Sequence, residues 1–240
     1  MRSAELASHA SWLVGHADDN MVLAQRLGEW ISNAPELEED IALGNIALDH
    51  LGVARALYTH AAGIEGMGRT EDDFAMRRAE REFLNVLLVE QSNGDFAHTM
   101  VRGLFFDAYQ VNLWADLSGS EGETLAGIAA RAEKEARYHL LHSSTWVVRL
   151  GDGTDESHRR AQQAVDALWR YTGELFEGEA AKYQDDWHRS VQTVLDEAGL
   201  LVPEDPYQRG GGRRGLHSEH LGPLLAEMQW MQRSYPGLEW

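Results

Sequence analysis

The 240-residue chain contains no cysteine, and this absence excludes a whole group of chemistries. Without a thiol there is no disulfide scaffold, thiolate metal site, iron–sulfur cluster or cysteine nucleophile. Proline is scarce, with only five residues, and no apolar run is long enough to span a membrane. The N-terminal stretch MRSAELASHASWLVGHADD also lacks the apolar segment of a signal peptide. We therefore expect a cytoplasmic protein without a membrane span.

Positively charged residues are also few. The chain has 21 lysines and arginines against 39 aspartates and glutamates, which gives a formal net charge of −18. Such a surface repels the phosphates of nucleic acids and anionic lipid headgroups. We therefore expect neither nucleic acid nor a membrane surface as a partner.

Apolar residues recur at spacings of three and four, which predicts helices throughout. The predicted helices cover residues 3–31, 36–62, 72–84, 95–117, 123–150, 154–176 and 185–198, and a last helix begins near residue 217. The four longest suggest a ferritin-like four-helix bundle with additional C-terminal helices, an all-α fold. We expect one domain over residues 1–240, with the core bundle in 1–150 and the additional helices in 151–240.

Two of the long helices carry more apolar residues than one face can hold. The second is apolar almost all round, which predicts a buried helix; its large apolar residues are Ile41, Leu43, Ile46, Leu48, Leu51, Val53 and Leu57. The fourth adds apolar residues on further sides in its C-terminal half, at Leu140, Leu141, Val147 and Val148. This half requires a second packing partner, either another part of the chain or another subunit.

The stretch EKEARYHLLH, from residue 133 to 142, raises the question of a metal site, because Glu135, His139 and His142 would lie within one arc of a helix. Ferritin-like dinuclear sites need a Glu from each of two helices and a Glu-x-x-His from each of the other two. None of the eleven histidines has Glu three positions before it. Alanine stands there in both expected motifs, at Ala47 before His50 and at Ala136 before His139.

We interpret His50, Asp107 and His139 as a vestigial polar cluster in the core, hydrogen-bonded together because burying such groups unpaired costs several kcal/mol. A non-standard metal site and ordinary, partly exposed residues remain the alternatives. We assign no catalytic, cofactor-binding or metal-binding residue. The Asp-x-x-His occurrences that begin at Asp95, Asp155 and Asp185 stand at predicted helix starts, where Asp ordinarily caps the helix or favours its dipole.

The segment RGGGRRG, residues 209–215, is the nearest approach to a phosphate-binding loop. Its arginines could meet an anion, but we interpret it as a flexible surface connection before the last helix. Its role stays open at this point.

Several long stretches resemble one known family. They are LAQRLGEWISNAPELEEDIALGNIALDHLGVAR, FLNVLLVEQSNGDFAHT, EKEARYHLLHSSTW with RLGDGTDES, LWRYTGELF and GLHSEHLGPLLAEMQWMQRSYPG. Together they are similar to the C-subunit family of bacterial ring-1,2-phenylacetyl-CoA epoxidase, and the resemblance covers nearly the whole chain.

The resemblance implies a ferritin-like, non-catalytic subunit without its own cofactor. In that family a catalytic A subunit holds the di-iron site and epoxidises the ring of phenylacetyl-CoA, a small B subunit joins it, and a reductase brings electrons from NADPH. The pathway is aerobic phenylacetate degradation. The implied partners are therefore the A subunit, the B subunit and the reductase, with self-association also open.

Three interpretations of function follow. The first is a structural subunit that supports a catalytic partner. The second is a di-iron or dimanganese oxidase with altered ligands that acts on its own, and the broken Glu-x-x-His motifs disfavour it. The third is a helical binding or storage protein acting alone, and the surplus apolar residues of the fourth helix disfavour it.

Overall fold

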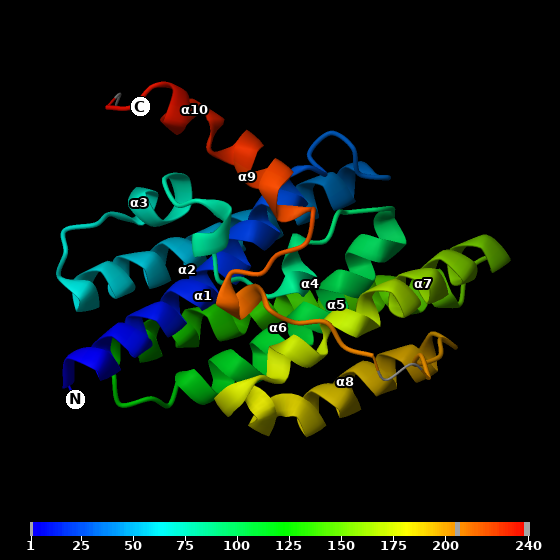
Figure 1. Cartoon of the computed structure of the whole chain (residues 1–240). Helices are drawn as coiled ribbons and strands as arrows, with labels where there is room; N and C mark the ends of the chain where they lie inside the picture. Colours follow the sequence, from blue (N-terminus) through cyan, green and yellow to red (C-terminus); the bar gives the residue numbers. More distant parts are fainter. Residues whose placement is uncertain (1, 205–206, 238–240) are drawn as a thin grey trace. The chain divides into compact units, whose positions relative to one another are not determined.

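In the computed structural model, which describes residues 2–204 and 207–237, every regular element is a helix (Figure 1). The predicted all-α class is confirmed, and the four longest helices are those expected of a ferritin-like bundle. The chain forms two compact units, Met1–Ser92 with Gly211–Trp240 and, between them in sequence, Asn93–Gly210. These limits differ from the expected division after residue 150, and the single domain stays a prediction.

The first unit is built on helices α1 (Arg2–Gly28) and α2 (Leu37–Glu65), which pack along each other. Helix α2 ends at Gly66, whose φ of 64° is left-handed and whose N–H donates to the Ala62 carbonyl. The chain then forms α3 (Glu71–Met76), a 3₁₀ turn (Glu80–Glu82) and α4 (Leu87–Glu90). The predicted helix over 72–84 is therefore wrong beyond Met76, because the chain leaves the helix there and carries Arg78 to a carboxylate of α1.

The C-terminal part of the first unit contains a 3₁₀ turn (Gly212–Arg214), α9 (Leu221–Met228) and α10 (Trp230–Ser234). The last helices begin at Leu221 rather than near His217, because the His217 ring is used in hydrogen bonds to Glu90 and to the Phe83 carbonyl. The interpretation of residues 209–215 as a surface connection is wrong for Gly211, Gly212 and Gly215, which are buried, whereas Arg209, Gly210 and Arg214 are exposed. Arg213 binds Asp19 of α1 at 2.6 Å.

The second unit is built on α5 (Phe96–Leu117) and α6 (Glu123–Gly151), and α7 (Asp155–Leu168) and α8 (Gln184–Glu197) pack against both. The predicted cap at Asp95 is present, because its carboxylate accepts the His98 N–H, and α7 begins with a capping box between Thr154 and Ser157. Because α7 and α8 cover α6, a second packing partner for α6 lies in this chain. Leu141 nevertheless stays 65% exposed.

The predicted helix over 154–176 ends as an α-helix at Leu168. Three 3₁₀ segments follow, at Trp169–Tyr171, Gly173–Phe176 and Gly178–Tyr183. These tight turns bring Trp169 and Phe176 onto the Trp187 ring, with ring centroids 5.6 and 5.2 Å from it. The indole N–H of Trp187 donates to the Phe105 carbonyl at 2.8 Å, so this aromatic cluster joins α8 to α5. Packing of these aromatic rings thus explains why residues 169–176 do not continue the α-helix that was predicted to reach residue 176.

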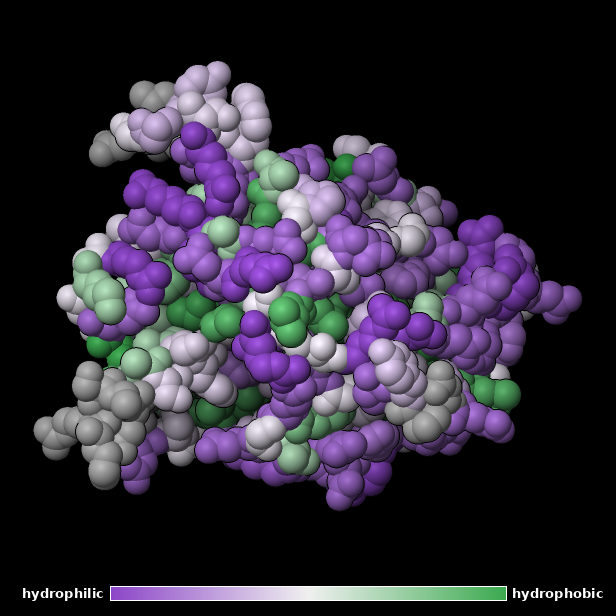
Figure 2. Space-filling model, in the orientation of Figure 1, coloured by the Kyte–Doolittle hydropathy of each residue, from purple (hydrophilic) through white to green (hydrophobic). Residues whose placement is uncertain are grey.

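The surface is mainly hydrophilic on the face drawn in Figure 2, with small apolar patches between the polar groups. One apolar face contradicts the prediction that α2 is buried all round: Leu37, Ile41 and Leu48 are 70%, 57% and 64% exposed. No helix in the described part of the chain has the length and apolar content needed to cross a bilayer.

Candidate functional site

Helix α1 carries a run of buried polar residues, and the carboxylates among them are paired with hydrogen-bond donors and positive charges inside the first unit. Asp18 accepts from both Arg78 and Tyr58 and from the Leu84 N–H at 2.7 Å. The neighbouring Asp19 accepts from the Val86 N–H at 2.8 Å and forms an ion pair with the C-terminal segment. These contacts hold the segments around residues 78–86 and 213 against α1.

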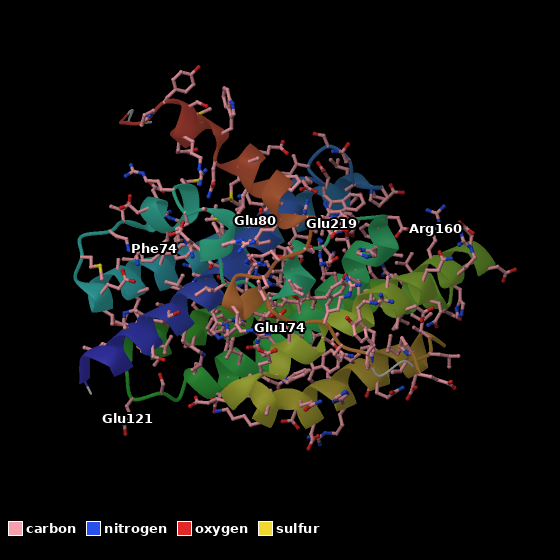
Figure 3. The ribbon with its side chains drawn as sticks, in the orientation of Figure 1. Phe74, Glu80, Glu121, Arg160, Glu174 and Glu219 are labelled. Atoms are coloured by element: carbon pink, nitrogen blue, oxygen red, sulfur yellow. The ribbon has the colours of Figure 1, made fainter. Side chains whose placement is uncertain are left out.

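Arg78 is the centre of this network. Its guanidinium donates to Asp18, to the Phe74 carbonyl at 2.6 Å and to the Glu82 carbonyl at 2.7 Å. Burial lowers the pKa of Arg78, but the charge of Asp18 and its hydrogen bond, together with the charges of Tyr58 and Glu82, outweigh that effect and raise the pKa overall. Burial, with Asp18 beside the hydroxyl, raises the pKa of Tyr58 well above its usual value. The Phe74 ring, labelled in Figure 3, stacks on the Tyr58 ring at 5.4 Å.

In the first unit, the candidate histidine on α2 is held by an amide. The Nδ1 of His50 lies 2.8 Å from Oδ1 of Asn20, and the Asn20 amide donates to the His16 carbonyl at 2.8 Å. Because Oδ1 can only accept, Nδ1 of His50 carries the proton. Ala47, one turn earlier on α2, supplies no carboxylate. Sequence reasoning missed Asn20, although its place among the buried residues of the first helix was a usable signal.

In the second unit, α5 and α6 bring Asp107 and His139 together. Their candidate ligand atoms lie within 4.8 Å of each other, and the Ser143 hydroxyl donates to Asp107 Oδ2 at 2.8 Å. The helices approach closely here, since a Cβ on Gly103 would lie 3.2 Å from that of Ser143. Burial raises the pKa of Asp107 to about 6, against the opposing effects of His139 and of the Ser143 hydrogen bond. Ser143 is the second residue that sequence reasoning missed.

The residues present do not fit a carboxylate-bridged dinuclear metal site. Each pair of long helices would have to supply a Glu and a Glu-x-x-His motif. The first pair offers Asn20 and His50 without a carboxylate, and the second offers Asp107 and His139 with Ala136 in place of Glu. Because His50 belongs to the other unit, the predicted cluster of three residues stays a prediction.

Glu135, His139 and His142, the three residues that suggested a metal site, have different environments in the structure. Glu135 binds Arg131 on its own helix at 2.8 Å, while the side chain of His139 is buried. His142 is half-buried. The carboxylate of this stretch is therefore part of a helix-surface ion pair.

Comparison with known proteins gives two matches. A family model described as phenylacetic acid catabolic protein matches residues 1–240. The chain is 48% identical over 237 residues to a protein of Escherichia coli (strain K12) that is named as the C subunit of 1,2-phenylacetyl-CoA epoxidase. This alignment covers 93% of the chain and 95% of that relative.

Proposed function

Because the chain belongs to the phenylacetic acid catabolic protein family, we propose that it is a structural, non-catalytic subunit of a phenylacetyl-CoA 1,2-epoxidase in aerobic phenylacetate catabolism. In this role it supports a catalytic A subunit that carries the di-iron site, alongside a B subunit and a reductase. The Escherichia coli relative, itself named as one subunit of an epoxidase, supports a place in a multi-subunit assembly.

One observation carries the non-catalytic part of the proposal. Where a dinuclear site needs carboxylates, the paired long helices carry Asn20, Ala47 and Ala136, and only Asp107 keeps an acid. A metal site built from oxygen ligands needs several carboxylates to balance the charge of the ions. The same helices hold His50 and Asp107 in hydrogen bonds to Asn20 and Ser143, which is how buried polar groups are satisfied in a structural core.

Two further parts of the proposal follow from this role. The chain holds no cofactor of its own, because the di-iron centre and the electron transfer from NADPH belong to its partners. It works in the cytoplasm, in agreement with the absence of a membrane-spanning helix from the described residues.

The test is reconstitution with and without this chain. Turnover of phenylacetyl-CoA by the A subunit, the B subunit and the reductase should be low when this chain is omitted and should rise when it is added. The chain alone should show no turnover. Equal turnover with and without the chain would contradict a supporting role, and turnover by the chain alone would contradict the non-catalytic assignment.

A further inference from the structure

The first unit contains a cavity of about 380 Å³ between α1, the end of α2 and the segment 67–84. Small-molecule sites in proteins have volumes of roughly 300–1,000 Å³, and an apolar cavity of roughly 150 Å³ is enough for benzene. Six of the side chains around the cavity are apolar: Leu6, Val14, Ile64, Met67, Phe74 and Leu84. The cavity therefore has the size and the walls of a site for a small apolar molecule.

The cavity has a buried floor and an exposed mouth. Val14 and Phe74 are buried, whereas Leu6 and Met67 are 49% and 75% exposed. The guanidinium of Arg69 lies 4.1 Å from the centroid of the Phe74 ring, which is labelled in Figure 3. A ligand can therefore enter past Leu6 and Met67 and place its apolar part against Val14 and Phe74.

The buried cation of the cavity, Arg78, has no donor left for a ligand. A guanidinium carries five N–H groups. Arg78 donates two of them to Asp18 and the others to the Tyr58 hydroxyl and to the carbonyls of Phe74 and Glu82. Because Asp18 also balances the charge of Arg78, the floor of the cavity does not require an anionic ligand.

Arg69, whose side chain is 37% exposed, keeps a donor that a ligand can use. Its Nε and Nη2 bind both oxygens of the Glu65 carboxylate, and among the described residues its Nη1 donates to no acceptor. A further carboxylate here would be repelled by Glu65, and an ammonium group would be repelled by Arg69. A neutral carbonyl oxygen can accept from Nη1 without either repulsion.

We propose that this cavity binds a neutral, apolar molecule with one carbonyl group, such as a ketone or an ester that carries a ring or a short chain. The apolar part lies against Val14 and Phe74, and the carbonyl oxygen accepts from Nη1 of Arg69. Burial of the apolar part supplies most of the affinity, and the hydrogen bond to a charged donor gives the preference for a carbonyl compound. The site lies within the first unit and does not depend on the proposed function.

The experiment titrates the full chain with octan-2-one and measures the dissociation constant by ligand-observed NMR and the shift of the thermal unfolding midpoint. Octanoate and octylammonium have the same number of carbon atoms and carry opposite charges, so they test the preference for a neutral ligand. Ala7→Trp places a large side chain at the mouth, and its control is Ser8→Trp, at the next residue, which is also exposed but does not line the cavity. Arg69→Met removes the donor, and its control is Arg55→Met, at an exposed arginine that is also paired with a glutamate, Glu71.

Octan-2-one should raise the unfolding midpoint of the wild type and should bind about tenfold more tightly than octanoate or octylammonium. Ala7→Trp and Arg69→Met should each weaken its binding by about tenfold, the latter because a hydrogen bond to a charged group is lost, and both controls should bind like the wild type. The unfolding midpoint of each variant without ligand shows whether it is folded.

Failure of the wild type to bind octan-2-one would refute the site. Unchanged binding in folded Ala7→Trp would refute its location, and unchanged binding in folded Arg69→Met would refute the carbonyl contact. Equal affinity for octanoate or octylammonium would refute the neutral ligand class.

Discussion

Replacing Asp107 by Asn should stabilise the chain at neutral and alkaline pH. The substitution keeps the shape of the side chain and an oxygen that can accept the Ser143 hydroxyl, but it removes a carboxylate that burial disfavours in its charged form. Raising the pKa from 3.8 to about 6 is worth at most about 3 kcal/mol. We expect a gain of about 1–3 kcal/mol in the free energy of unfolding at pH 8.

The pH dependence gives the sign of this effect. The folded chain keeps the Asp107 proton up to a pH of about 6, whereas the unfolded chain loses it near 3.8. The wild type therefore loses stability relative to Asp107→Asn as the pH rises through this window. Urea denaturation of both proteins at pH 5 and pH 8 measures the difference. A variant less stable than the wild type at pH 8, or a difference equal at both pH values, would refute the reasoning.

Replacing His139 tests the same pair from the other side. His139→Ala removes a group that lowers the pKa of Asp107 and leaves the buried carboxylate less compensated, so it should cost about 2–4 kcal/mol. Replacing Asp107 and His139 together by apolar residues of similar size should cost less, because no buried charge remains. A double variant less stable than His139→Ala would show that the carboxylate is not the source of the cost.

The remaining predictions concern the first unit. Arg78→Met leaves Asp18 as a buried, uncompensated carboxylate and should lower the free energy of unfolding by about 3–5 kcal/mol, measured by urea denaturation. Adding Asp18→Asn should restore part of the lost stability. An Arg78→Met variant as stable as the wild type would contradict this prediction. Burial lowers the pKa of His217, but hydrogen bonds to Glu90 and to the Phe83 carbonyl, together with the charges of Glu90 and Glu80, outweigh it and raise that pKa overall. The wild type should therefore be more stable than His217→Gln, most clearly below pH 6.5. The difference in free energy of unfolding should shrink as the pH rises through the raised pKa of His217. A difference that grows with pH would contradict a raised pKa.

Local signals in the sequence predicted much of the fold. Asp95 caps its helix as expected, because a cap depends on residues only three positions apart. The long-range contacts left no such signal. Asp18 binds Arg78 and Glu90 binds His217 across long stretches of chain, and these pairs decide where the short helix of 71–76 ends and where the last helices begin.

The candidate site was predictable in part. Broken motifs at Ala47 and Ala136 can be recognised from spacing alone, and the pairing of Asp107 with His139 follows from their places on facing helices. The roles of Asn20 and Ser143 could not be predicted in the same way, because they depend on which face of each helix is buried beside His50 and Asp107. The apolar pattern of α2 indicated contact on every side, but composition alone could not tell whether this chain or another protein covers the exposed face.

The central claim is that the buried histidine of α6 is structural. The most direct measurement is turnover of phenylacetyl-CoA per assembled complex for His139→Ala, together with metal analysis of the purified chain. We predict turnover equal to that of the wild-type complex once the amount of folded, assembled subunit is matched, and no stoichiometric iron, manganese or zinc in the chain. A loss of turnover of about a hundredfold in a fully folded and assembled variant, or two metal ions per chain that this substitution removes, would contradict the account.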